Sequence, residues 1–101
     1  MSVIRIGTGS TPTGSTAWTV YTPTGIYVDV NTSSAGFGTT PLYFTSIGGN
    51  GGQWATVGAT SIYSATPTGF RVYLRWVDNS PLTPAQANSS GWHINWLGIA
   101  P

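Results

Sequence analysis

A four-residue motif, Thr-Pro-Thr-Gly, occurs three times in this 101-residue chain, at 11–14, 22–25 and 66–69. Proline fixes the φ angle at the first central position of a turn, and glycine accepts a positive φ. Each copy therefore predicts a tight turn ahead of an apolar or alternating segment. The unequal intervals between the copies favour separate turns over an internal structural repeat.

The segments after the second and third copies alternate strictly between apolar and polar residues. A period of two places neighbouring side chains on opposite faces, so each segment is predicted to be a strand with one buried face. The predicted buried residues are Ile26, Val28 and Val30 in one strand and Phe70, Val72, Leu74 and Trp76 in the other, opposite Tyr27, Asp29, Arg71, Tyr73 and Arg75.

Other short apolar segments lie between clusters of Gly, Ser, Asn and Pro, which are typical of loops. A short helix is predicted at 83–86, where Thr, Pro and Gln form a capping-box pattern. Six or seven short strands predict an all-β fold, a small antiparallel β-sandwich that forms a single domain over residues 1–101. The further strands are predicted at 3–6, 17–21, 42–47, 59–63 and 92–99.

Charged residues make up only 5% of the sequence, against about 25% in a typical soluble domain, and the formal charge is +1. Such a chain lacks the positive electrostatic field that would attract nucleic acid or an acidic membrane surface. No run approaches the ~20 apolar residues needed to cross a bilayer. The first ten residues lack the apolar region of a signal peptide, so we expect synthesis in the cytoplasm, with incorporation into a virion or release by lysis as routes of export.

Few side chains in this sequence can move protons or act as nucleophiles. The chain has one histidine, His93, and two acidic residues, Asp29 and Asp78, with no glutamate, lysine or cysteine. No nucleophile-elbow spacing supports a Ser-His-Asp set, and two isolated Asp are more often an ion-pair partner and a turn residue than a glycosidase pair. The same residues show no metal-ligand spacing. We therefore expect no enzymatic activity, no cofactor and no metal.

The low charge also bears on the edges of the predicted sheets. Edge strands are usually protected from association by Lys, inward-pointing charges or Pro, and this chain has no Lys. We therefore predict a homo-oligomer whose subunits cover these edges. A monomer with short, hydrated edge strands is the alternative.

Two of the three arginines share the polar face of the strand at 70–76. Two explanations stay open: ion pairing with Asp29 and Asp78, or a planar hydrogen-bonding surface for another subunit or a ligand. If the strand at 92–99 pairs with the strand at 70–76, one polar face results, and we predict that it forms an oligomer interface. The members of this face are Arg71, Tyr73, Arg75, His93 and Asn95.

The tryptophans divide between predicted buried faces and undetermined positions. Trp76, Trp92 and Trp96 fall on buried faces, whereas the sequence does not decide the places of Trp18 and Trp54. The glycine-rich run GGNGGQW before and including Trp54 is predicted to be a surface loop rather than a phosphate loop, since a strand follows it. An exposed aromatic ring beside planar polar groups suits sugar binding, because the apolar face of a sugar stacks on the ring.

The C-terminal half combines YSATPTGFRVYLRW with WHINWLGI, and FGTTPLYFTSIGG stands upstream. These segments resemble the H-type lectin domain, the small sandwich of snail agglutinins and of the C-terminal part of discoidins. The resemblance spans residues 37–99. Its matched positions in the C-terminal half are Tyr63, Ser64, Pro67, Thr68, Gly69, Phe70, Trp76, Ile94, Trp96, Leu97 and Ile99.

The resemblance implies a six-stranded antiparallel sandwich that forms a trimer and binds a galactose-type sugar between subunits. The chain departs from the family at the site, since Val77 replaces a sugar-contacting His and Ser61 replaces an Arg. The resemblance therefore implies a displaced carbohydrate site. Its candidate residues are Arg75, Trp76, Asp78 and Asn79.

Two functional hypotheses result. The first is a non-catalytic carbohydrate- or surface-binding module that acts as a homo-oligomer, with a trimer implied by the resemblance. The second is a structural subunit or decoration protein of a phage particle, tail or other bacterial surface assembly, whose polar face contacts neighbouring chains. The expected partners are accordingly other copies of the chain, a glycan, and other proteins of such an assembly.

Overall fold

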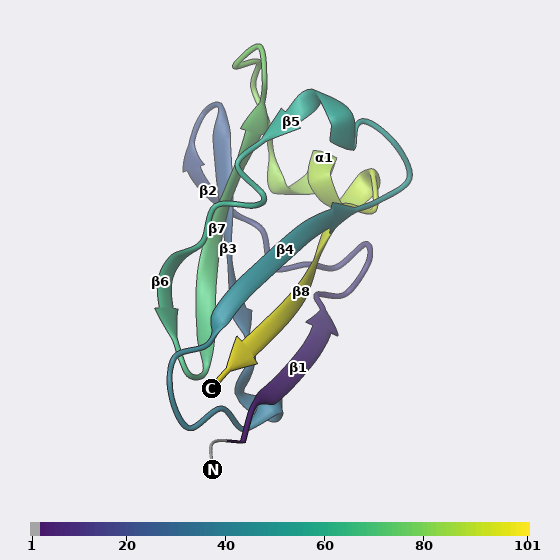
Figure 1. Ribbon diagram of the computed structural model, residues 1–101. Helices are drawn as coiled ribbons and strands as arrows, with labels where there is room; N and C mark the ends of the chain where they lie inside the picture. Colours follow the sequence, from purple (N-terminus) through teal and green to yellow (C-terminus); the bar gives the residue numbers. More distant parts are fainter. Residues whose placement is uncertain (1–2) are drawn as a thin grey trace.

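The computed structural model describes residues 3–101, which form two antiparallel β-sheets packed against each other (Figure 1). One sheet has the strand order β1-β8-β4, and the other has the order β2-β3-β7-β5, with β6 also paired to β7. The predicted all-β sandwich is confirmed. The elements are β1 (Arg5–Ser10), β2 (Thr19–Thr22), β3 (Gly25–Asn31), η1 (Ser33–Ala35), β4 (Leu42–Gly48), η2 (Gln53–Ala55), β5 (Thr56–Val57), β6 (Tyr63–Thr66), β7 (Gly69–Trp76), α1 (Pro84–Ser89) and β8 (His93–Ala100).

Two of the three Thr-Pro-Thr-Gly copies form the same hairpin turn. One joins β2 to β3 and the other joins β6 to β7, and in each the first Thr is paired with the Gly across the turn. In each, the hydroxyl of the first Thr accepts a hydrogen bond from the backbone N–H of the second Thr, at 3.3 Å and 3.2 Å respectively. The remaining copy, at 11–14, forms a turn after β1. All three copies are turns, as predicted.

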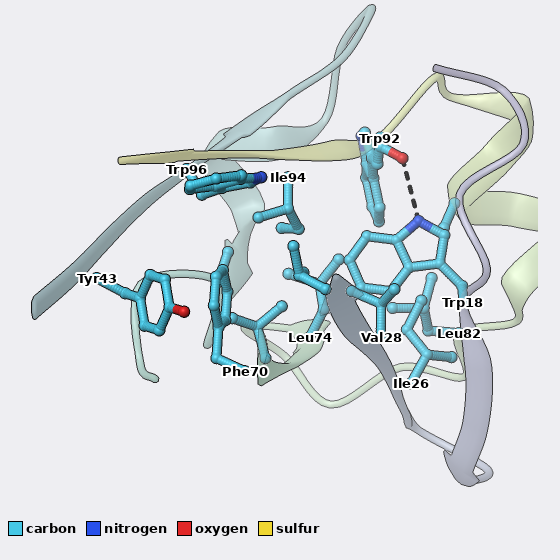
Figure 2. Close-up of a cluster of buried hydrophobic side chains, with 14 of the residues drawn as sticks. Trp18, Ile26, Val28, Tyr43, Phe70, Leu74, Leu82, Trp92, Ile94 and Trp96 are labelled. Atoms are coloured by element: carbon cyan, nitrogen blue, oxygen red, sulfur yellow. Dashed lines mark hydrogen bonds between the residues drawn. The ribbon is translucent and has the colours of Figure 1, made fainter. Parts of the chain in front are cut away.

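The core lies between the two sheets and uses the apolar faces that the alternation predicts (Figure 2). The indole N–H of Trp18 donates a hydrogen bond of 3.0 Å to the backbone carbonyl of Trp92, which satisfies a buried polar group at one end of the core. At the other end, the ring of Tyr43 lies 4.5 Å from the ring of Phe70. The central strands contribute Ile26, Val28 and Val30 from β3, Phe70, Val72 and Leu74 from β7, and Ile94 and Trp96 from β8.

The tryptophans separate into core and surface. Trp92 and Trp96 are buried as predicted, and Trp76 packs against the core with its ring 4.9 Å from that of Trp92. Trp18 also belongs to the core, whereas Trp54 is 93% exposed on the 3-10 turn that ends the glycine-rich loop. The predicted surface loop at 48–54 is therefore present, and its tryptophan faces solvent.

The predicted short helix is α1, which lies at the end of the sandwich where β4 ends and β8 begins (Figure 1). Thr83 is its N-cap: the Thr83 hydroxyl accepts from the Gln86 backbone N–H at 3.2 Å, and the Gln86 side chain accepts from the Thr83 N–H at 3.0 Å. Ala87 is buried, and its carbonyl accepts from the Trp92 N–H at 2.9 Å. The capping box thus anchors the chain just before β8.

The number and bounds of the strands differ from the prediction in several places. Residues 3–101 contain eight strands rather than six or seven, and the predicted strand at 59–63 is mostly a turn between β5 and β6. Gly58 has φ +109°, which interrupts an extended strand, and Ala59 then turns into the core. The first strand begins at Arg5 and runs to Ser10, later than the predicted 3–6.

The predicted shared polar face of Arg71, Tyr73, Arg75, His93 and Asn95 is wrong. His93 and Asn95 lie on β8, which pairs with β1 and β4, whereas the other three residues lie on β7 in the opposite sheet. Both strands bury their apolar residues in the one core between the sheets. Their polar residues therefore point away from each other, on opposite sides of the sandwich.

Candidate functional site

Four tyrosines gather on the outer face of the five-stranded sheet. Tyr73 lies at the centre and makes edge-to-face contacts with Tyr21 of β2 and Tyr63 of β6, each with ring centroids 4.9 Å apart. Tyr27, the residue paired with Tyr73 on β3, lies 5.9 Å from it. Tyr21 and Tyr63 are exposed, while the two central rings are half-buried. The four rings form the tyrosine cluster.

An open groove of about 550 Å³ adjoins this cluster. Ligand sites in proteins typically enclose ~300–1,000 Å³ and combine aromatic walls with a few polar groups, and this groove has both features. We call it the tyrosine groove. Its lining includes the rings of Tyr21, Tyr63 and Tyr73, the hydroxyl-bearing residues Thr22, Thr24 and Ser61, and the cation Arg75.

Two glycines shape the groove. Gly25 is paired with Arg75, and a Cβ at Gly25 would lie 3.2 Å from the Thr22 hydroxyl oxygen and reduce the space beside it. Gly58 has φ +109°, and a Cβ there would collide with the backbone carbonyl of Tyr73. Glycine at position 58 therefore lets the segment after β5 run directly against β7, and glycine at position 25 leaves Arg75 without a facing side chain.

Arg71 and Asp29 form a salt bridge beside the cluster. The two residues are paired across β3 and β7, and Arg71 Nε and Nη2 donate to the two Asp29 carboxylate oxygens at 2.6 and 2.9 Å. The guanidinium carbon also lies 4.0 Å from the centre of the Tyr27 ring. The hydrogen bond from Arg71 lowers the pKa of Asp29, and the same bond raises the pKa of Arg71. This arginine therefore has its partner within the chain.

Arg75 has no such partner. It is exposed, and its Nη1 donates to the backbone carbonyl of Trp76 at 3.2 Å. Within residues 3–101, the pair of Arg71 and Asp29 is the only salt bridge. Of the two explanations for the arginines, ion pairing therefore describes Arg71, whereas Arg75 places an unpaired cation beside the tyrosine groove.

The structure brings only one of the four predicted carbohydrate-site residues to the groove. Arg75 lines it, but Trp76 points to the opposite face of β7 and packs against Trp92. Asp78 and Asn79 lie in the turn after β7, where the Asn79 N–H donates to the Trp76 carbonyl at 3.0 Å. Hydrogen bonds from Ser80 lower the pKa of Asp78. The four residues therefore do not converge on one site.

On the other sheet, His93 and Asn95 have partners of their own. The Ser10 hydroxyl donates to Asn95 Oδ1 at 2.7 Å, and Asn95 Nδ2 donates to the Ser46 hydroxyl at 3.3 Å. His93 Nδ1 lies 2.9 Å from the carbonyl of Gly91. Both polar side chains of β8 therefore have hydrogen-bond partners within the chain.

Most of the rest of that outer surface is apolar. Ile6 and Leu42 both pair with Ile99, and Phe44 pairs with Leu97, so these five residues form two neighbouring rows across β1, β8 and β4. Ile6, Leu42 and Phe44 are 64%, 68% and 54% exposed. We call these residues the apolar face. A contiguous exposed apolar patch on a folded domain commonly marks an interaction site.

Sequence reasoning missed two walls of the tyrosine groove, Tyr21 and Tyr63. Each lies on a four-residue edge strand, too short for the alternation that placed Tyr27 and Tyr73 on an outer face. Their one signal is position, since each precedes a Thr-Pro-Thr-Gly turn whose following strand runs back beside it. Reading both turns as hairpins would have placed a tyrosine on each neighbouring strand.

The described part of the chain contains no group of three or more His, Cys, Asp or Glu residues placed to hold a metal ion. Nor does any helix in residues 3–101 have the length and apolar character to span a membrane. Comparisons with protein-family models, with curated proteins and with solved structures found no match to this chain. The resemblance to the H-type lectin domain therefore stays a prediction.

Proposed function

We propose that this protein is a non-catalytic binding module that takes a glycan in the tyrosine groove and acts as a homo-oligomer. The observation that carries the proposal is the grouping of three tyrosine rings, three hydroxyl-bearing residues and an arginine around one open groove. Three further hollows, one beside Phe70, one beside Ser10 and one beside Phe44, do not combine exposed aromatic rings with so many hydrogen-bonding groups.

The chemistry of the groove matches the chemistry of a sugar. A pyranose has an apolar C–H face, which stacks on an aromatic ring, and hydroxyls that need directional hydrogen bonds at its edge. Tyr21 and Tyr63 expose their rings, while Thr22, Thr24 and Ser61 bring hydroxyls to the same groove. Tyrosine supplies contact area at a low cost in side-chain entropy, so the site needs little ordering on binding.

The apolar face supports the homo-oligomer, and we assign its occupant as a second copy of this chain. The face and the row next to it, Ser10, Asn95 and Ser46, carry no ionised group, so they offer no complement to a charged partner. An uncharged apolar surface is instead suited to contact with a second copy of itself, as in an interface between identical subunits. The trimer is the assembly that the family resemblance implies.

The strand edges agree with this assignment. The five-stranded sheet ends in short strands, of four residues in β2 and β6 and two in β5. The three-stranded sheet has longer edge strands, of six residues in β1 and seven in β4, next to the apolar face. The less protected edges thus lie where a second copy would cover them.

A glycan panel tests the proposal. Wild-type protein should bind at least one class of oligosaccharide, and Tyr63→Ala should weaken that binding by roughly fivefold, because an aromatic contact contributes about 1 kcal/mol. Trp54→Ala is the matched control, since it removes an aromatic ring that is 93% exposed and outside the groove. Binding lost in the control but kept in Tyr63→Ala would move the site to Trp54 and contradict the proposal.

The second candidate function is a structural subunit of a particle or surface assembly. The observation that favours it is the exposure of apolar side chains in more than one place outside the groove, among them the apolar face and Trp54. A component that contacts neighbours on two sides needs two such regions. A homo-oligomer in native mass spectrometry that is silent on every glycan would favour this function over the first.

A further inference from the structure

Arg75 is the one feature of the tyrosine groove that a neutral sugar does not need. It is paired with Gly25 on β3 and with Val57 on β5. Neither neighbour can neutralise a guanidinium, since glycine has no side chain and valine is apolar. The cation therefore stands in the groove between uncharged neighbours.

Arg71, on the same face of β7, is an arginine whose charge is neutralised by a partner. Arg71 lies opposite Asp29 and forms two hydrogen bonds with its carboxylate. The only other acidic side chain of the sequence is Asp78, whose Oδ1 accepts from the Ser80 backbone N–H at 3.0 Å in the turn after β7. Both carboxylates thus have other partners, and neither pairs with Arg75.

The guanidinium of Arg75 also retains most of its hydrogen-bonding capacity. Within residues 3–101, its one hydrogen bond runs from Nη1 to the Trp76 carbonyl, whereas a guanidinium has five N–H donors. Its planar fork of donors matches the two oxygens of a carboxylate, which bind as a pair of parallel, charge-assisted hydrogen bonds. In Arg71 the same fork is already filled by Asp29.

We infer that the tyrosine groove selects acidic sugars, with the sugar ring against the tyrosines and its carboxylate on Arg75. This inference rests on the proposed function, because it specifies the ligand of the same groove. The chemical class is a glycan with a free carboxylate, such as a uronic acid or a sialic acid.

The test is calorimetric titration with a panel of oligosaccharides that contain uronic or sialic acids, each offered beside its carboxyl-reduced counterpart. Reduction removes the charge and keeps the ring and its hydroxyls. Wild-type protein should bind the acidic member of a pair about tenfold more tightly, because hydrogen bonds to charged groups are the stronger ones. Arg75→Gln should bind both members equally, and Arg75→Lys, which keeps the charge without the planar fork, should fall between the two.

Arg5→Gln is the matched control, because it changes the net charge by the same amount on the other sheet, where Arg5 Nη1 donates to the Ala35 carbonyl at 3.3 Å. It should keep the preference for the acidic member. Equal binding of both members by wild-type protein would overturn the inference and leave the proposed function standing. If Arg5→Gln also abolished the preference for the acidic member, that preference would come from the net charge of the protein, and the inference would be overturned. No binding across the whole panel would overturn both proposals.

Discussion

Asp29 on β3 and Arg71 on β7 are directly paired residues of adjacent antiparallel strands, and two hydrogen bonds of 2.6 and 2.9 Å join their side chains. Four residues further along β7, Arg75 is paired with Gly25, and within residues 3–101 it forms no salt bridge with a carboxylate. The two arginines look equivalent in the sequence, because they share one face of one strand. Their cross-strand neighbours assign them different roles, one in the fold and one at the groove.

The Asp29 salt bridge predicts how stability depends on pH. The hydrogen bond from Arg71 lowers the pKa of the Asp29 carboxyl in the folded protein from its ordinary value of 3.8. A lowered folded pKa stabilises the fold at higher pH, and this contribution is lost as the pH falls through the folded value. We expect the melting temperature to fall between about pH 5 and pH 2, and to fall less in Asp29→Asn.

Asp78→Asn provides the comparison for this measurement, because the pKa of Asp78 is also lowered, through hydrogen bonds with Ser80. Asp78→Asn should still show the part of the fall in melting temperature at low pH that comes from Asp29. Differential scanning calorimetry across the pH range measures both variants. An Asp29→Asn protein with the acid sensitivity of the wild type would contradict the role given to the salt bridge.

The hydrogen bond from Trp18 to the Trp92 carbonyl predicts that substitutions of Trp18 and of Trp54 differ in their effect on protein stability. Trp18→Phe removes the indole N–H and leaves a buried carbonyl without its donor, so it should destabilise the protein by about 1–3 kcal/mol. Trp54→Phe makes the same substitution at a fully accessible position and should leave stability nearly unchanged. Urea denaturation measures both. Equal losses would show that burial of Trp18 does not govern its contribution.

Substitution of Gly58 should destabilise the protein by more than its positive φ angle alone would cause, because the added side chain also meets a steric clash. In Gly58→Ala the new methyl group would meet the Tyr73 carbonyl at a position where φ is already +109°, so we expect a loss of about 1–3 kcal/mol. Gly14→Ala separates the two effects, because Gly14 has φ +80° but open space around its Cβ. Thermal unfolding should show the smaller loss in Gly14→Ala. The reverse order would contradict the close approach of this segment to β7.

The apolar face predicts a dependence of assembly on two exposed side chains. Leu42→Ser with Phe44→Ser should shift the protein toward the monomer at micromolar concentration, because it removes apolar area from the proposed contact. Val20→Ser with Val77→Ser is the matched control, since both valines are 61% exposed outside the apolar face. Sedimentation velocity measures the change. A monomeric wild-type protein at every concentration would contradict the homo-oligomer.

The local structure of this chain was largely predictable, because its strongest patterns are local. Alternation over 26–30 and 70–76 gave the buried faces of β3 and β7, and the Thr-Pro-Thr-Gly motif gave the turns. The capping pattern at Thr83 and Gln86 gave α1. In each case the residues that decide the structure lie within a few positions of one another.

The candidate site was less predictable, because it depends on which strands are neighbours. Alternation on β8 shows that His93 and Asn95 share an outer face, but it does not tell which sheet β8 joins. Tyr21 and Tyr63 contact Tyr73 on the same outer face from opposite sides of β7, and each is brought there by a separate hairpin. Pairing across β3 and β7 also decides that Asp29 meets Arg71 rather than Arg75.

Glycan binding in the tyrosine groove is tested most directly by an NMR titration of isotope-labelled protein with the glycan panel. We expect the amide and side-chain chemical shifts to change at Tyr21, Tyr63, Tyr73 and Arg75, with little change at Trp54 or Asp78. Shift changes that centre on Trp54 or on the turn at Asp78, or an absence of changes with every glycan, would contradict binding in the tyrosine groove.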